Sequence, residues 1–103
     1  MPATADATLT ALADPTRRAV LESLRAGPQP VGAIAAGLPV SRPAVSQHLK
    51  VLATARLVTS QPEGRRRLYA IDPAGLDALR GWVEAFWTDA LTRFTDLAEE
   101  EEP

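Results

Sequence analysis

Residues 41–71 read SRPAVSQHLKVLATARLVTSQPEGRRRLYAI, and this stretch decides the fold that the sequence predicts. Ser41 is a favoured helix N-cap residue, and Pro43 falls in the first turn, where its missing N–H is tolerated. The apolar residues that follow recur at spacings of four and three, which is typical of one face of a helix. They are Val45, Leu49 and Leu52. We therefore expect a helix over residues 41–55.

Two short segments after this helix have the pattern of β-strands. Residues 57–61 and 67–71 flank a turn that contains Gly64, as in a β-hairpin. Three consecutive arginines, 65–67, lie at the rim of this turn. A helix followed directly by a basic hairpin is the arrangement with which a winged helix-turn-helix contacts DNA, and we interpret residues 62–67 as its wing.

The rest of the chain supplies further helices with clear start and stop signals. Asp14 and Pro15 together form a favourable helix start, and a short turn over 38–40 separates two helices as a helix-turn-helix requires. The expected helices lie around Leu9 and Leu12, from Pro15 to before Gly27, from Pro30 to Gly37, over 41–55, and from Pro73 onward. The sequence thus predicts a mostly α winged helix-turn-helix with a small β-hairpin wing, in the order α-α-α-α-β-β-α. We expect one domain over 1–98, which includes N- and C-terminal dimerisation helices, and an acidic tail over 99–103 that frays.

Charge is distributed unevenly along the 103 residues, although the net charge is only −2. Residues 41–70 carry six basic residues and one acid, a net +5, whereas residues 71–103 carry two basic residues and nine acids, a net −7. A positive segment is compatible with nucleic-acid binding even when the total is acidic. The chain has no cysteine, which excludes disulfides and thiolate metal sites. No apolar run is long enough to cross a membrane and the N-terminus is unlike a signal peptide, so we expect a cytoplasmic protein.

The final helix carries an apolar stripe that is close to a heptad pattern. The stripe comprises Leu76, Leu79, Val83, Phe86, Ala90, Phe94 and Leu97, and it is widened by Trp82, Trp87 and Leu91. A long apolar helix face needs a partner, and we interpret it as a homodimer interface together with the first helix. The interface residues that we expect are Leu9, Leu12, Val83, Phe86, Trp87, Ala90 and Phe94. A small-molecule pocket lined by the aromatic residues is the alternative.

Four blocks of the sequence resemble the arsenic-repressor (ArsR) family of bacterial transcription factors. They are ALADPTRRAVLESL over 11–24, SRPAVSQHLKVLATARLV over 41–58, GRRRLYAID over 64–72 and WVEAFWTDALTRF over 82–94. The last block resembles a subgroup whose final helix carries paired aromatic residues and lacks the usual metal ligands. The resemblance implies a homodimeric winged-helix repressor whose first and last helices pack together. Many members of this family release DNA when a metal binds cysteines of the third helix, or Asp and His residues of the last. Here the third helix, VGAIAAG, offers no ligand and the last has no histidine, so we expect no metal site and no cofactor.

The residues expected to contact DNA lie on the exposed side of the 41–55 helix and on the wing. They are Ser41, Arg42, Pro43, Ser46, Gln47, His48, Lys50, Arg65 and Arg66. Arg42 can bind guanine and Gln47 can bind adenine through paired hydrogen bonds. Ser46 suits a base or a phosphate, Lys50, Arg65 and Arg66 suit the DNA backbone, and His48 a phosphate or a protein backbone group. For Arg67 we expect an ion pair with Glu63. A merely solvated helix face is the alternative for the helical residues.

These observations together favour a dimeric repressor that binds an inverted-repeat operator in double-stranded DNA through the 41–55 helix and the 62–67 wing. Its two recognition helices would lie about 34 Å apart. The alternatives are a repressor that responds to a metal or small ligand, and a winged helix that binds proteins. We expect no enzymatic activity, because the chain has one histidine, no cysteine and no phosphate-binding glycine loop.

Overall fold

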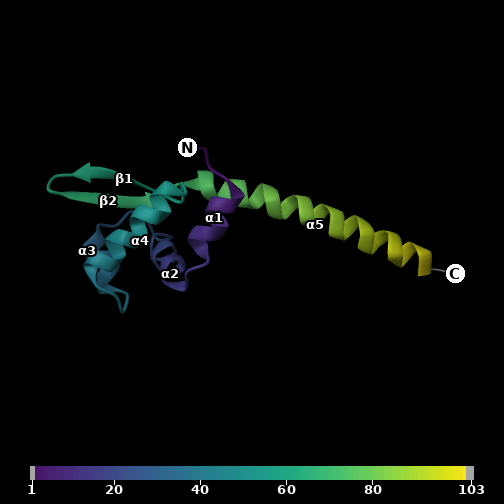
Figure 1. The fold of residues 1–103 in the computed structure, drawn as a ribbon, viewed down its shortest axis with the longest axis horizontal. Helices are drawn as coiled ribbons and strands as arrows, with labels where there is room; N and C mark the ends of the chain where they lie inside the picture. Colours follow the sequence, from purple (N-terminus) through teal and green to yellow (C-terminus); the bar gives the residue numbers. More distant parts are fainter. Residues whose placement is uncertain (1, 102–103) are drawn as a thin grey trace.

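The computed structural model describes residues 2–101 and contains five helices and one two-stranded antiparallel sheet in this range (Figure 1). The elements are α1 (Ala5–Leu12), α2 (Pro15–Ser23), α3 (Val31–Ala36), α4 (Arg42–Thr54), β1 (Val58–Glu63), β2 (Arg66–Ile71) and α5 (Pro73–Glu101). This order confirms the predicted winged helix-turn-helix. Figure 1 shows α1 to α4 and the hairpin gathered into one body, from which α5 projects alone.

The helix start signals of the sequence act as they were expected to. Asp14 caps α2 through Oδ1, which accepts hydrogen bonds from the backbone N–H of Thr16 at 2.7 Å and of Arg17 at 3.2 Å. Ser41 caps α4 in the same way, since its Oγ accepts from the N–H of Ala44 at 3.2 Å. These bonds satisfy donors that the first turn of a helix otherwise leaves unpaired.

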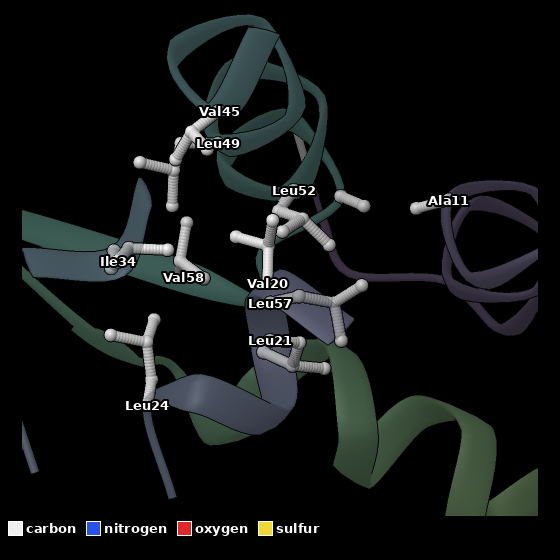
Figure 2. Packing of buried hydrophobic residues seen from close by; sticks show 11 residues of the cluster. Ala11, Val20, Leu21, Leu24, Ile34, Val45, Leu49, Leu52, Leu57 and Val58 are labelled. Carbon is white, nitrogen blue, oxygen red and sulfur yellow. The ribbon is translucent and has the colours of Figure 1, made fainter. Parts of the chain in front are cut away.

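The hydrophobic core lies where α2, α3, α4 and the start of β1 meet. The stripe predicted on α4 faces it, with Val45, Leu49 and Leu52 almost completely buried. Figure 2 shows these side chains pointing toward residues of the other elements. The remaining core members are Ala11, Val20, Leu21, Leu24, Ile34, Ala55, Leu57 and Val58. Burying this face against α2 and α3 leaves the opposite face of α4 free.

The hairpin is longer than the sequence predicted. Its strands pair up to Glu63 and Arg66, so that only two residues form the turn, and Gly64 supplies the positive φ of 61° that this turn requires. The expected first strand began at Leu57, whereas β1 begins one residue later. Leu57 instead lies in the connection: its N–H donates to Leu52 at 2.9 Å, and its carbonyl accepts from Asp72 at 3.0 Å.

A single β-bridge, which the sequence analysis missed, joins the segment before α3 to the hairpin. Gln29 and Tyr69 exchange two backbone hydrogen bonds, with N···O distances of 2.9 and 2.8 Å. The bridge brings the start of α3 beside β2. It therefore fixes the distance between the helix-turn-helix and the wing.

The first turn of α5 is joined tightly to the corner between α4 and β1. The Gly75 N–H donates to the Arg56 carbonyl at 2.8 Å, and a methyl group on Gly75 would lie 2.8 Å from the carbonyl oxygens of Ala55 and Arg56. From the other side the buried Thr8 hydroxyl of α1 donates to the Gly75 carbonyl at 2.8 Å. Only glycine fits this contact, so α1, α4 and α5 are held in a fixed relation.

From Arg80 onward α5 has no contact that buries it. Every residue from 80 to 100 is exposed, and the molecule measures 69 × 29 × 21 Å with a radius of gyration of 18.2 Å. A compact chain of 100 residues has a radius of gyration of about 13 Å. Of the acidic tail predicted to fray, residues 99–101 continue α5, whereas 102–103 lie outside the described residues. Within the described part of the chain, no helix is both long and apolar enough to span a membrane.

Candidate nucleic-acid interface

The face of α4 that points away from the core carries the residues predicted to contact DNA. Gln47 and Lys50 are exposed, and His48 is half-buried at the edge of this face. The other exposed members, at the beginning of the helix, are Ser41, Arg42, Pro43 and Ser46. The amide of Gln47 and the hydroxyl of Ser46 can both donate and accept hydrogen bonds, as contact with base edges requires.

Two arginines of α2 have structural partners. Arg17 Nε donates to the Ala11 carbonyl at 2.7 Å, and Arg18 Nη1 donates to the Leu12 carbonyl at 2.6 Å. Both residues thus bind carbonyls at the C-terminal end of α1, which a cation stabilises. The sequence analysis did not identify these carbonyls as their partners, because the turn between α1 and α2 brings them into reach.

Asp14, beside these arginines, has a pKa below its ordinary value of 3.8. The largest cause is the hydrogen bond from the Arg17 backbone N–H, which favours the charged carboxylate. Partial burial opposes the shift, while the Thr16 N–H and the charges of Arg17 and His48 add to it.

The arginines of the wing differ in their partners. Arg66 Nη2 forms an ion pair with Glu63 Oε1 at 2.9 Å, and Arg67 Nε donates to the Ser60 hydroxyl at 3.1 Å. The expectation that Arg67 pairs with Glu63 was therefore wrong. The strand register places Arg66 opposite Glu63, which the sequence alone did not specify. This ion pair is half-exposed and contributes little to stability.

A groove lies between the wing and the start of α3, and the sequence analysis did not foresee it. Arg42 of α4 lies against Gly32 of α3, because a methyl group on Gly32 would be 3.0 Å from Arg42 Nη2 and 3.2 Å from Cζ. The guanidinium of Arg42 thus lies over the start of α3. The groove is lined by Pro30, Val31, Gly32, Arg42, Arg65, Arg66, Arg67 and Tyr69.

The side chains predicted to form a dimer interface are uncovered in the single chain. Phe86 is 61% exposed and Phe94 is 74% exposed. Trp82 packs edge-to-face on Phe86, with ring centroids 4.7 Å apart. Leu9, Val83, Trp87 and Ala90 are exposed too, and Leu12 is half-buried. An exposed aromatic stripe of this length is typical of a surface that another chain covers.

The acidic residues of the chain do not gather into a metal site in the part that the structure describes. Over residues 2–101, no group of three or more His, Cys, Asp or Glu side chains lies close enough together to hold a metal ion. Asp89 and Asp96 of α5 do line one shallow surface depression, together with Arg93.

Known proteins share both the sequence and this geometry. A family described as a helix-turn-helix domain matches residues 12–61. The HTH-type transcriptional regulator Rv2034 of Mycobacterium tuberculosis is 60% identical over 91 residues, which cover 88% of this chain and 85% of that protein. The structure of an ArsR-like transcriptional regulator from Rhodococcus sp. RHA1 superposes with a TM-score of 0.78 and is 30% identical, over 95% of this chain and 92% of that chain. The chain belongs to the ArsR family of transcriptional regulators. It is therefore a helix-turn-helix regulator and not an enzyme.

Two further comparisons extend this result. The transcriptional repressor SdpR of Bacillus subtilis is 32% identical over 76 residues, 74% of this chain and 84% of that protein. A solution structure of the homodimeric winged helix-turn-helix DNA-binding domain of Mb0332 from Mycobacterium bovis, described as a possible ArsR-family regulator, superposes with a TM-score of 0.64. Its sequence is 30% identical, and the match covers 85% of this chain and 82% of that chain.

Proposed function

We propose that this ArsR-family regulator is a homodimeric repressor that binds an inverted-repeat operator through α4 and the wing and does not respond to metals. One observation carries the proposal: all six basic residues of the +5 segment 41–70 are exposed, on α4, at its end and at the wing. Only Arg56 and Arg66 of these six form ion pairs within the described residues. Cations that outnumber the carboxylates around them favour a polyanionic partner such as DNA.

The contacts divide into two kinds. Gln47 and Ser46 are exposed near the beginning of α4, the end of a recognition helix that approaches base edges. Lys50, a turn further along α4, and Arg65 and Arg66, on the wing, carry charges that suit phosphates. In this proposal the first group selects the operator and the second supplies affinity.

The surface area of the single chain supports a dimer. The chain exposes 7212 Å², whereas a folded monomer of this mass exposes about 5,600 Å². The excess lies along α5, whose aromatic stripe would pair with the same stripe of a second copy in a symmetric interface. The two α4 helices of such a dimer would face successive turns of a duplex.

The donor set of the chain argues against metal control. The chain has no cysteine, and its single histidine lies on α4, so α5 offers only oxygen ligands, which favour hard cations such as Ca²⁺ and Mg²⁺. We accordingly expect zinc, cadmium, nickel and arsenite to leave operator binding unchanged. Stoichiometric release of the operator at micromolar metal would contradict this and would direct attention to Asp89 and Asp96.

Selection of duplexes by the purified protein, followed by salt titration of the affinity, tests the proposal. We expect an inverted repeat, and a logarithmic affinity that falls with logarithmic salt concentration by about 0.9 for each phosphate neutralised. A salt-independent affinity, or selection of a single half-site by a monomer, would contradict it. A protein-binding winged helix would show no duplex affinity at all.

A further inference from the structure

We infer that the groove between the wing and α3 binds one phosphate group of the DNA backbone, and that Arg42 serves as a phosphate ligand and not as a reader of guanine. The inference rests on the proposed DNA-binding function and assigns a separate task to one part of it. Sequence reasoning placed Arg42 among the base contacts, whereas its side chain lies beside Gly32 and lines this groove.

The shape of the groove follows from two backbone features. The paired backbone hydrogen bonds between Gln29 and Tyr69 hold the start of α3 against β2. The absence of a side chain at Gly32 leaves room for the Arg42 guanidinium on the α3 side. The walls are therefore held by backbone geometry, which gives an anion a prearranged site.

The charges of the groove are not balanced by acids. Its lining contains four arginines and no carboxylate. Within the described residues Arg42 and Arg65 have no hydrogen-bond or ion-pair partner, Arg67 bonds only the neutral Ser60 hydroxyl, and Arg66 alone forms an ion pair, with the half-exposed Glu63. Guanidinium groups bind phosphate through two parallel hydrogen bonds, which makes a cluster of them selective for phosphate oxygens.

The position of the groove fits a backbone phosphate better than a base. A recognition helix lies in the major groove of DNA. A sugar-phosphate strand borders that groove, so a wing that flanks the helix lies beside this strand. The groove between the wing and α3 would face that strand, whereas Gln47, further along the exposed face of α4, would face the bases.

Neutralising single phosphates tests the inference directly. Operator duplexes carrying one neutral methylphosphonate at each successive position should reveal, in each half-site, one position where the wild-type protein loses about tenfold in affinity. At that position the Arg42→Ala protein should lose clearly less affinity than the wild type does, because one of the arginines that bind this phosphate is already gone. Additive losses at every position would overturn the inference.

A comparison of specific and nonspecific duplexes supplies the second readout. Arg42→Ala should weaken operator and random DNA by the same factor and lower the salt slope by about 0.9 per protomer. A loss confined to the operator would identify Arg42 as a base reader and overturn the inference, while leaving the proposed function intact. Failure of the wild-type protein to bind any duplex would instead contradict the proposed function itself.

Gly32→Ala provides a variant that keeps the charge of Arg42 but moves its guanidinium. A methyl group there would lie 3.0 Å from Arg42 Nη2, so we expect this variant to lose part of the DNA affinity that Arg42→Ala loses. The loss should occur even though alanine favours the helix more than glycine does. Gly37→Ala is the matched control, because its methyl would meet its nearest atom at an ordinary 3.8 Å and should leave binding unchanged. Equal effects of the two variants would contradict the role given to Gly32.

Inorganic phosphate could bind the same arginines as a backbone phosphate does. Competition between inorganic phosphate and operator DNA distinguishes these two ligands. At constant ionic strength, inorganic phosphate and sulfate should displace the operator equally weakly. Selective displacement by millimolar inorganic phosphate would show that the groove binds a free anion, and it would overturn the assignment to the DNA backbone.

Discussion

The winged body and the outer part of α5 use the same kinds of apolar residue in opposite ways. In the body, Val45 and Leu52 are fully buried by helices of the same chain. On α5, Phe86 and Phe94 repeat at helical spacing as well, yet they are more than half exposed. An apolar stripe therefore predicts that a helix face is buried. It does not predict whether the same chain or a second chain buries it.

The largest effect should come from placing a charge in the uncovered stripe. Phe86→Glu should convert a dimer to a monomer, because burial of a phenylalanine is commonly worth about 3–5 kcal/mol and the change acts twice in a symmetric interface. Sedimentation at tens of micromolar, with operator titration, measures this. Thr92→Glu, on the opposite side of α5, is the control and should stay dimeric. If the wild-type protein sediments as a monomer, the stripe of α5 is not buried by a second copy, which would contradict the prediction.

A second prediction distinguishes residues that are buried within the chain from residues that only a partner chain would bury. In the monomeric Phe86→Glu background, Leu52→Ala should lower the free energy of unfolding by about 2–5 kcal/mol, since it leaves a cavity in the core. Leu97→Ala in the same background should change it by less than about 0.5 kcal/mol, because this side chain is already 54% exposed. Urea unfolding, followed by circular dichroism, gives both values. Similar losses for the two variants would contradict the contrast between the two regions.

A third prediction concerns the exposed face of α4. The other elements of the winged body hold this face in place but do not bury it. Gln47→Ala should weaken the preferred operator by roughly 1–3 kcal/mol and relax selection at one base position per half-site. Gln61→Ala, an exposed glutamine on β1, is the control and should keep that base preference. Repeated operator selection with each variant is the measurement. An equal loss on all duplexes would show that Gln47 does not read a base.

The smallest effect should be the pH dependence of the α2 cap in the body. The folded pKa of Asp14 lies below its ordinary 3.8, so ionised Asp14 stabilises the fold above that pH. The contribution is lost as the pH falls through the folded pKa. Asp14→Asn keeps an acceptor for the cap but removes the charge, so the difference in unfolding free energy from wild type should shrink below pH 4. A difference that stays constant between pH 7 and pH 3 would contradict this.

Local signals were enough to predict most of the fold. The caps Asp14 and Ser41, the stripe of Val45, Leu49 and Leu52, and the turn at Gly64 each depend on a few neighbouring residues. Capping, helical periodicity and tight turns are short-range effects, so a sequence records them directly. The charge of residues 41–70 and the exposed positions of α4 also followed from spacing along one helix.

Contacts between segments far apart in the chain were decided only by the tertiary structure. The Gln29–Tyr69 bridge, the contact of Thr8 with Gly75 and the placing of Arg42 beside Gly32 join residues from different elements. Neither propensity nor periodicity specifies which groups meet in such contacts, because these contacts depend on how whole elements pack. The sequence thus determined the elements and the charged surface of this protein, and packing alone decided where its arginines point.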